Sequence, residues 1–451
     1  MKHRFLRVCL TSLLALAMLL PMASCTGDPA ATETTAPTVT TAPTETEAQT
    51  KAPLPTEISL PEAYATADTV YECDDGSMMY TFNAKAVTDF EAVCAYYTQK
   101  GFEVYSNTVK AENRFTTFVG DGPMAHVYWL KDNGELNVVI SETASGTLPP
   151  MTPAVADGDY ECTIIQLKDN GNVNGMAYVI QLKDGSYIVY DGSYTSQARR
   201  IQKYLEDNYK GEGKPVVRAW ILTHSHNDHF PTFQTFSRRL SDSAIVEHII
   251  FSPLNDESFT MDDEQGYFSS QKFKEDAAKL KGAKIVYAHT GMEFTFCNLK
   301  LEVLMTPETL FKGSSSFGNF NNTSVVTRLY SEDYSALFLG DIAVMGSDRM
   351  ASLYGDYLKS DICQVSHHGV EDVPLSFYEI VQAPILYYPC NIWLYDQTER
   401  HFDVRTALEE RDYTKEILIA GCGEYKRAWG TTFDADTPLV IPDHPTKGPA
   451  A

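Results

Sequence analysis

The sequence predicts a large α/β or α+β domain behind a smaller α+β domain. From about residue 161, short apolar and β-branched stretches typical of strands alternate with amphipathic stretches typical of helices. Residues 58–148 instead contain one helical stretch and several strand-like stretches separated by polar turns, which favours an antiparallel sheet. The segment 146–153 (GTLPPMTP) marks a linker. We therefore expect an accessory domain over residues 58–148 and a main domain over residues 155–442, and 451 residues are enough for both.

Residues 1–25 predict a bacterial export signal. Lys2, Arg4 and Arg7 precede an apolar stretch, residues 8–20, which is shorter than the about 20 residues that cross a bilayer. Small residues directly before Cys25 are typical of a lipobox, so we expect Cys25 to be lipidated and to hold the mature protein on the extracellular face of the bacterial membrane. Ordinary cleavage nearby, with Cys25 unmodified, is the alternative, and the threonine-rich segment that follows makes it the weaker one.

Residues 26–57 are rich in Thr, Ala and Pro and contain almost no bulky apolar side chains. Such a segment cannot bury enough apolar surface to offset the entropy lost on folding, so we expect it to stay extended and solvated. We interpret it as a tether that holds the folded domains away from the lipid surface.

The accessory domain is predicted to combine one helix with several strands. The spacing of apolar residues over Phe90–Tyr97 predicts the helix, and Gly101 predicts a turn into a strand. Later strands are predicted at 114–118, 126–129 and 136–140. His126 lies in one of them, where we expect a hydrogen-bonded core histidine rather than a ligand.

The main domain is predicted to alternate strands with helices. Helices are expected at 196–209, 269–280 and 404–410, and strands at 162–167, 177–182, 187–190, 216–222, 244–251, 284–287, 293–296, 299–304, 335–341, 361–369 and 417–420.

The strongest motif, His224-Ser225-His226-Asn227-Asp228-His229, follows the strand predicted at 216–222. His224 and His226, two residues apart, can turn the same way and hold one cation, and Asp228 with His229 can hold a second. Neutral imidazole and carboxylate suit zinc, iron or manganese, and open coordination positions are typical of catalytic rather than structural sites. A solvated His-rich turn is the alternative, which so dense a group of ligand-type residues makes the weaker one.

This loop and later motifs resemble metallo-β-lactamase-fold hydrolases, whose signature is HxHxDH. An apolar run from residue 335 ends at Gly340-Asp341, and another from residue 361 ends at His367-His368-Gly369. Together with Asn321-Asn322-Thr323-Ser324, the set is similar to the extracellular hydrolase domain of ComEC-type DNA-uptake proteins and to the choline-phosphate esterases of Gram-positive cell surfaces. The resemblance covers roughly residues 158–440 and is more specific for the fold than for the substrate.

The resemblance implies a four-layer αββα sandwich that binds two divalent metal ions, zinc in the first place and manganese or iron as alternatives. It implies that Asp341 is a carboxylate shared by both metals. Because adjacent strand residues point to opposite faces, a bend is needed to bring His367 and His368 into one pocket. We assign His368 as a metal ligand and His367 as a pocket acid or substrate contact, with the reverse assignment left open. Asp228 is expected to act both as a ligand and in catalysis.

The resemblance also suggests supporting residues. Asn322, Ser324 and His401 are candidates for substrate binding, and Asp191 for a carboxylate that orients the loop carrying His224. The alternatives are ordinary cap and turn chemistry for Asn322 and Ser324, a simple turn at Asp191-Gly192, and an exposed loop for His401.

The chain departs from the family pattern at the third metal-binding histidine. Only His248 and His289 lie between the first histidine cluster and Asp341, and neither has the expected surroundings. Thr306-Pro307 stands roughly where ComEC-like members also lack this histidine. The metal at His224 would then be completed by water or substrate, which argues against β-lactam hydrolysis.

The cysteines beyond Cys25 number seven, are irregularly spaced and lie mostly in apolar stretches. We interpret them as small buried hydrophobic residues, with a Cys73–Cys94 disulfide as the alternative.

The formal net charge of −24 repels polyanions, which disfavours nucleic acid as a partner. We therefore expect a surface-anchored, metal-dependent hydrolase that uses a metal-bound hydroxide on a phosphoester, such as a wall- or lipid-linked phosphodiester. The alternatives are a ComEC-like nuclease and a non-catalytic ligand-binding lipoprotein that keeps the fold.

Overall fold

The computed structural model describes residues 52–152, 160–168, 174–255, 269–311, 319–370, 373–397 and 402–443. Apart from Ala52, these residues belong to one compact unit, Pro53–Ala451. The predicted export signal, Cys25, most of the predicted tether and His401 lie outside the described residues. A search of the described helices finds none with the length and apolar character needed to cross a membrane.

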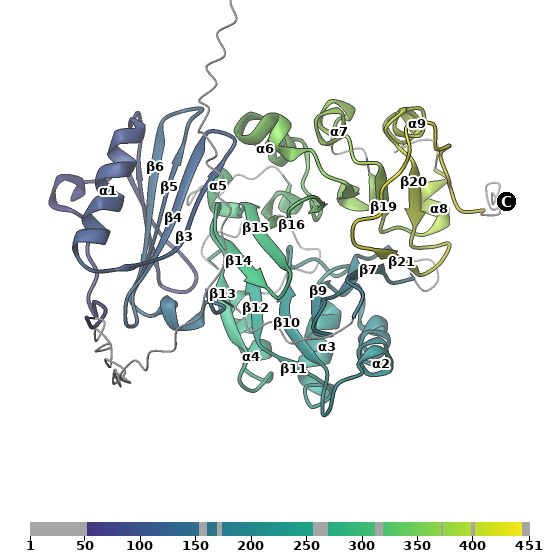
Figure 1. The fold of residues 1–451 in the computed structure, drawn as a ribbon, viewed down its shortest axis with the longest axis horizontal. Helices are drawn as coiled ribbons and strands as arrows, with labels where there is room; N and C mark the ends of the chain where they lie inside the picture. The colour runs from purple at the N-terminus through teal and green to yellow at the C-terminus, as the bar shows by residue number, and fades with distance from the viewer. Residues whose placement is uncertain are drawn as a thin grey trace, which may run out of the picture. The chain divides into compact units, whose positions relative to one another are not determined.

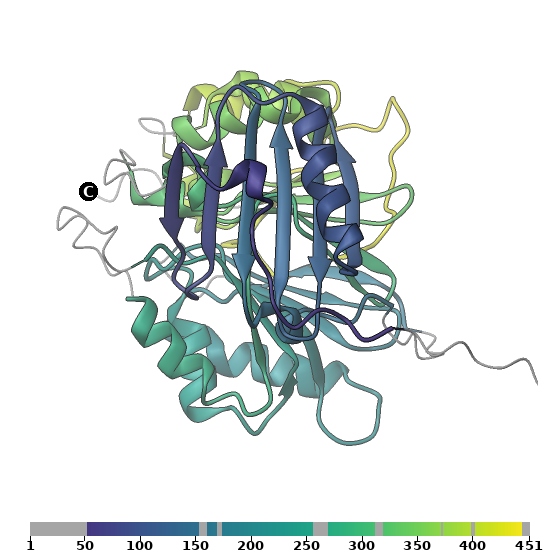
Figure 2. The ribbon, with the colours of Figure 1, turned by 90° about the vertical axis from the view of Figure 1, so that its left-hand side faces the viewer.

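The accessory domain is a six-stranded antiparallel sheet with a helix across one face (Figure 2). The strand order is β1-β2-β6-β5-β4-β3. The elements are β1 (Thr69–Glu72), β2 (Met78–Phe82), α1 (Val87–Gln99), β3 (Glu103–Lys110), β4 (Asn113–Val119), β5 (Met124–Leu130) and β6 (Glu135–Ser141).

Helix α1 forms where the apolar spacing predicts it. The Asp89 carboxylate accepts the backbone N–H of Ala86 at 2.9 Å and so satisfies a donor at the helix start. Gly101 follows the helix with a φ of 89°, a conformation that glycine adopts at little cost. The buried face of the helix packs on the sheet, and this core includes Phe90, Val93, Tyr97, Phe118, Val127 and Leu136.

The main domain contains two mixed sheets, each with helices on its outer side (Figure 1). The first sheet has the order β13-β12-β10-β9-β8-β7-β21, with β11 paired to β10. Its strands are β7 (Thr163–Gln166), β8 (Ala177–Gln181), β9 (Tyr187–Asp191), β10 (Val216–Ile221), β11 (Ile245–Val246), β12 (His248–Phe251), β13 (Lys284–Tyr287) and β21 (Tyr425–Ala428). Its helices are α2 (Ala198–Asn208), α3 (Pro231–Arg239) and α4 (Ser270–Ala277).

The second sheet runs β14-β15-β16-β17-β18-β19-β20. Its strands are β14 (Glu293–Phe296), β15 (Leu299–Met305), β16 (Val326–Tyr330), β17 (Ser335–Phe338), β18 (Ile362–Gln364), β19 (Ile385–Tyr388) and β20 (Glu416–Ile419). The associated helices are α5 (Pro307–Phe311), α6 (Val344–Tyr354), α7 (Leu375–Val381), α8 (Ile392–Tyr395) and α9 (Phe402–Glu409). The mixed α/β class with sheets between helical layers, predicted from the sequence, is confirmed.

The two sheets of the main domain share one apolar core. Tyr190 of β9 stacks on Phe338 of β17 with ring centroids 3.9 Å apart. The Tyr190 hydroxyl also lies 2.9 Å from Thr327 Oγ1 of β16, so the polar end of this buried ring is satisfied. These strands are buried on both faces, which explains why they appear in the sequence as continuous apolar runs.

The strands that carry the predicted site residues run in parallel. Strand β10 pairs in parallel with β9 and β12, and β18 pairs in parallel with β17 and β19. Parallel strands end at the same edge of a sheet. Asp191 and the loop from His224 therefore lie at one edge of the first sheet, and Asp341 and His368 lie at one edge of the second sheet.

The accessory sheet is joined to the main domain by buried polar contacts. Lys110 Nζ lies 2.9 Å from Glu293 Oε2 and 3.0 Å from Glu302 Oε2. His126 Nε2 lies 2.9 Å from the Thr290 carbonyl oxygen, and its Nδ1 lies 2.9 Å from Thr117 Oγ1. His126 is thus a hydrogen-bonded core residue, as expected.

Two details differ from the simplest expectation. The strand predicted at 244–251 is divided into β11 and β12 at Glu247, whose carboxylate accepts a 2.7 Å bond from Arg218. The alternative disulfide is absent, because Cys73 and Cys94 are both free thiols.

Candidate metal centre

The His-rich loop begins where buried strand β10 ends and finishes where α3 begins. Pro231 starts α3, a position at which a missing N–H costs nothing. Thr223 fixes the start of the loop, since both its N–H and its hydroxyl donate to the Asp191 carboxylate at 2.7 Å. Asp191 itself has a φ of 47°, a conformation that costs a non-glycine residue about 1–2 kcal/mol. The carboxylate is therefore held in a fixed position beneath the loop.

Asp191 also orients His229. Its Oδ2 lies 2.7 Å from His229 Nδ1, which directs the other ring nitrogen, Nε2, toward Asp341 Oδ2 at 3.0 Å. A carboxylate behind an imidazole is the usual support of a metal-ligating histidine, because it fixes the tautomer and the ring orientation. The positioning role predicted for Asp191 agrees with this geometry better than a simple turn does.

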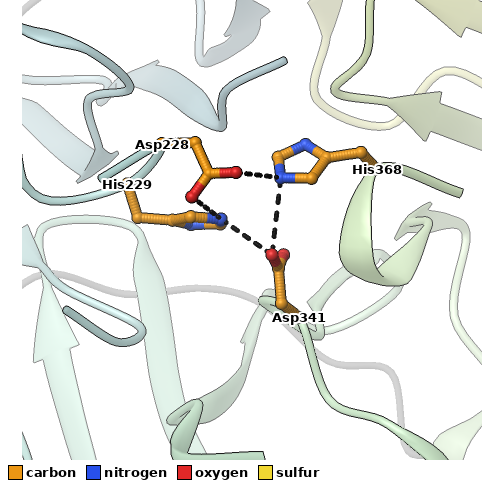
Figure 3. A group of neighbouring side chains, drawn as sticks. All are labelled: Asp228, His229, Asp341 and His368. Carbon is orange, nitrogen blue, oxygen red and sulfur yellow. Dashed lines mark hydrogen bonds and ion pairs between the residues drawn. The ribbon is translucent and has the colours of Figure 1, made fainter. Parts of the chain in front are cut away.

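Asp228, His229, Asp341 and His368 form a compact cluster in which one donor atom of each lies within 4.8 Å of all the others (Figure 3). His368 Nε2 lies 3.1 Å from Asp228 Oδ2 and 3.4 Å from Asp341 Oδ2. His229 Nε2 lies 3.9 Å from Asp228 Oδ1. Asp228 is partly exposed, while the other three are buried, so the cluster is open on one side only.

His224 and His226 lie beside this cluster, with the ring centroids of His224 and His229 4.3 Å apart. His224 Nε2 is 3.0 Å from His226 Nδ1 and 3.9 Å from Asp341 Oδ2. His224 is buried, and its Nδ1 lies 3.3 Å from Ser324 Oγ. Asp341 thus faces both groups of predicted ligands, which is the position that a shared carboxylate requires.

The bend needed at the second His pair is present. His367 and His368 both have positive φ angles, 47° and 57°, within the short helix η7 (Ser366–Gly369). His368 enters the cluster, and its Nδ1 lies 2.6 Å from the Pro389 carbonyl oxygen. His367 turns away and places Nε2 3.2 Å from Asn321 Nδ2 at the partly exposed side. The structure thus brings His368 into the cluster and leaves His367 outside it, and their predicted roles stay predictions.

Charges shift the pKa values of the cluster strongly. Burial lowers the pKa of His368, but the Asp341 and Asp228 carboxylates outweigh it and raise the pKa to about 10. Burial also lowers the pKa of His229, but the Asp341 and Asp191 carboxylates outweigh it and raise this pKa well above its usual value. Burial opposes ionisation of Asp341, yet the two imidazoles hold its pKa well below the usual range. Burial, then the charges of His229 and His226, lower the pKa of His224.

These residues fit divalent metal ions. With Nδ1–H donated to Asp191 or to the Pro389 carbonyl, the Nε2 atoms of His229 and His368 face the carboxylates, as neutral imidazole ligands would. Asp341 Oδ1 is buried and has no hydrogen-bond partner. A cation would satisfy this oxygen and replace the protons that hold the carboxylates and imidazoles together.

Asn322 and Ser324 make bonds within the protein. Asn322 Oδ1 accepts the backbone N–H groups of Ala343 and Gly346 at the start of α6, at 2.9 and 3.1 Å. Ser324 Oγ accepts the Asp341 N–H at 3.0 Å. Both residues therefore help to position Asp341, and their predicted contact with substrate stays a prediction.

The two histidines considered for the missing ligand are engaged elsewhere. His248 Nδ1 lies 3.0 Å from the Arg218 carbonyl oxygen, and His289 Nδ1 lies 3.2 Å from Glu308 Oε1. Beside His226 the structure instead places the ring of Phe320, with ring centroids 4.9 Å apart.

Three contacts of the site were missed from the sequence. Asn321 belongs to the Asn pair and Thr223 is adjacent to the motif, so both had a positional signal. The Pro389 carbonyl had none, because a backbone oxygen carries no residue-specific pattern.

Comparison with known protein families identifies residues 170–382 with the model described as the metallo-beta-lactamase superfamily. The matched residues include the His-rich loop, Asp341 and His368. Members are usually metal-dependent hydrolases and typically bind two metal ions. A comparison with curated proteins found no match.

Solved structures with this fold resemble the chain at low identity. YhfI from Bacillus subtilis, a metallo-beta-lactamase fold protein, is 11% identical, with 59% of this chain and 100% of YhfI covered and a TM-score of 0.35. CmlA from Streptomyces venezuelae, a diiron beta-hydroxylase, is 12% identical, with coverage of 58% and 45% and a TM-score of 0.29. Zn(2+)-bound PqqB from Methylobacterium extorquens is 12% identical, with coverage of 42% and 58% and a TM-score of 0.29.

Proposed function

We propose that this chain is a metal-dependent hydrolase of phosphoesters, with a wall- or lipid-linked phosphodiester as the substrate class. The observation that carries the proposal is the position of Asp341, whose Oδ2 lies 3.0 Å from His229 Nε2, 3.4 Å from His368 Nε2 and 3.9 Å from His224 Nε2. A protein that only captures a ligand has no need of a carboxylate between two ligand groups.

His224, His226 and Asp341 would hold one cation, and Asp228, His229, His368 and Asp341 a second. Two such cations lower the pKa of a water molecule and neutralise negative charge that develops on a phosphoryl oxygen. This chemistry requires no serine or cysteine nucleophile.

The protein groups around the cations have separate tasks. Asp191 fixes the orientation of the His229 ring through its contact with Nδ1, and Ser324 Oγ accepts the backbone N–H of Asp341. Asp228, on the partly exposed side, is the carboxylate best placed to accept a proton from an attacking water. His367, which contacts Asn321 and is partly exposed, would contact the substrate or donate a proton to the leaving group.

Charge supports a small substrate. The chain carries a formal net charge of −24, and a field of this sign repels duplex DNA more strongly than a small ester. We further propose that lipidation of Cys25 places the enzyme at the extracellular membrane surface, beside wall- and lipid-linked esters.

A ligand-binding lipoprotein is the second candidate, and one observation favours it. His248 and His289 bind elsewhere, so neither completes the coordination of a metal at His224 and His226.

The first prediction separates these functions. In the purified full chain, Asp341→Ala and His226→Ala should each lower the metal content and abolish hydrolysis of a chromogenic phosphodiester, because each removes a proposed ligand. The matched control is Asp333→Ala, an exposed carboxylate in the loop before β17. Metal content is measured by elemental analysis and folding by circular dichroism.

Full metal content in both ligand variants would show that the ligand set is wrong. A wild-type chain that binds both metals and hydrolyses no phosphoester would favour the binding protein.

A further inference from the structure

A second group of metal-ligand side chains lies away from the catalytic cluster. One donor atom each of Cys73, His289 and Glu308 lies within 4.8 Å of the other two, and all three side chains are buried. Cys73 belongs to the turn after β1 of the accessory sheet, His289 follows β13, and Glu308 lies in α5. The group therefore joins the accessory domain to the main domain.

We propose that Cys73, His289 and Glu308 bind a zinc ion that fastens the accessory sheet to the main domain. Thiolate, imidazole and carboxylate are the three side-chain ligands that zinc takes in proteins, and their mix of soft and hard donors suits this ion better than calcium or magnesium. Three protein ligands leave one position of a tetrahedral site, which a water molecule would fill.

Two buried atoms point to a ligand here. His289 Nε2 and Glu308 Oε2 are both buried and have no hydrogen-bond partner. Their residues are 2% and 6% exposed, so bulk water does not satisfy these atoms either. An unsatisfied buried polar atom costs about 1–3 kcal/mol, and such atoms are usually explained by a bound water or ion.

The other atoms of the group are held in place. The Cys73 N–H donates to the Ser77 carbonyl oxygen at 2.8 Å, which closes the turn that carries the thiol. Ser252 Oγ donates to Glu308 Oε1 at 3.1 Å, and the same oxygen lies 3.2 Å from His289 Nδ1. The His289 ring also stacks on the His126 ring, with centroids 6.4 Å apart and planes at 20°. The ligands are thus positioned by contacts from both domains.

The charges of the group balance with zinc. A thiolate and a carboxylate carry two negative charges, which a divalent cation cancels, so the buried assembly is neutral with a neutral imidazole. Burial, and then the Glu308 charge, raise the pKa of the Cys73 thiol well above its usual value, and a bound cation would favour the thiolate. The rival arrangement is a metal-free pair of His289 imidazolium and Glu308 carboxylate beside a neutral thiol.

Cobalt substitution distinguishes the two arrangements. The catalytic cluster offers only nitrogen and oxygen donors. Among the candidate metal clusters of the described residues, only this one contains a thiol, so a thiolate-to-cobalt charge-transfer band in the near ultraviolet would report Cys73. The full chain is loaded with Co²⁺ in the wild type, Cys73→Ser, His289→Gln, the control Cys94→Ser, and Asp341→Ala.

The band should appear in the wild type, persist in Cys94→Ser and Asp341→Ala, disappear in Cys73→Ser and shift in His289→Gln. Cys73→Ser should also lose one metal equivalent. X-ray absorption of the zinc-loaded wild type should show a sulfur neighbour at about 2.3 Å, a measurement that needs no variant. Absence of the band and of the sulfur neighbour in the wild type, or a band unchanged in Cys73→Ser, would overturn the proposal. Asp341→Ala should lose metal from the proposed catalytic centre but keep the cobalt–thiolate band. Failure of the proposed function and failure of the zinc proposal can therefore be told apart.

Discussion

Asp191 shows how much one side chain outside the proposed ligand set contributes to the centre. Its two oxygens bind the N–H and hydroxyl of Thr223 and the Nδ1 of His229. The sequence offered only an Asp-Gly pair after a strand, which fits a turn equally well. The difference arises because Thr223 and His229 approach Asp191 only when β9 and β10 pair in parallel.

The second prediction follows from these bonds. Asp191→Asn places an NH₂ group against donors that need an acceptor, so the His229 ring should lose its fixed orientation. Metal affinity should fall about 10- to 100-fold, the effect typical of residues that orient metal ligands. The measurement is competition for the metal with a chromogenic chelator, with Asp333→Asn as the control. Equal affinity in the wild type and in Asp191→Asn would show that His229 needs no support.

At the level of elements, much of the architecture could be predicted from the sequence. The predicted apolar runs became strands β7–β10, β12–β15, β17, β18 and β20, and the spacing of Phe90, Val93 and Tyr97 became α1, whereas β16 and β19 were not individually predicted. The positions of Asp341 and His368 could be predicted, because each follows a strand and neighbouring parallel strands end at the same edge of a sheet. A bend was expected at His367-His368, but its backbone geometry could not be predicted, since positive φ angles at two successive histidines leave no residue pattern. The Cys73 group could not either, because its members are far apart in the chain.

The third prediction concerns β5, which carries His126. Burial lowers the pKa of His126 to about 3, whereas the pKa of a histidine in the unfolded chain is about 6.5. Between these values the unfolded chain binds one more proton than the folded chain. The free energy of unfolding should therefore fall as pH drops through this window, by up to about 1.4 kcal/mol per pH unit from this residue.

Urea unfolding at pH 7 and pH 5 measures this slope. His126→Gln keeps a donor and an acceptor but removes the titration, so the variant should lose less stability than the wild type over the same interval. Identical losses would mean that His126 does not titrate differently on unfolding.

At the level of the whole molecule, the formal net charge of −24 disfavours the approach of a polyanion such as duplex DNA. The fourth prediction is that a small phosphodiester is hydrolysed with a much higher kcat/KM than duplex DNA, because DNA must approach against a negative field. The ratio should shrink as salt rises and screens the repulsion. Rapid DNA cleavage at low salt that is lost in Asp341→Ala would restore the nuclease interpretation.

The fifth prediction concerns the proposed anchor. Cys25→Ser should release the protein from membranes or leave it unprocessed, because the proposed lipid-bearing residue is lost. Cell fractionation with immunoblotting measures the distribution. Unchanged membrane association with normal processing would show that another element holds the protein.

The buried Lys110 has a consequence for the stability of the main domain by itself. It lies in the accessory sheet, yet it pairs with Glu293 and Glu302 on β14 and β15. Without the accessory sheet, Glu302 would keep Arg328 and Glu293 would keep Lys300, but the cation that both carboxylates share would be lost. Breaking a buried ion pair is destabilising. We therefore expect the main domain, expressed without residues 53–150, to unfold at a lower urea concentration than the full chain.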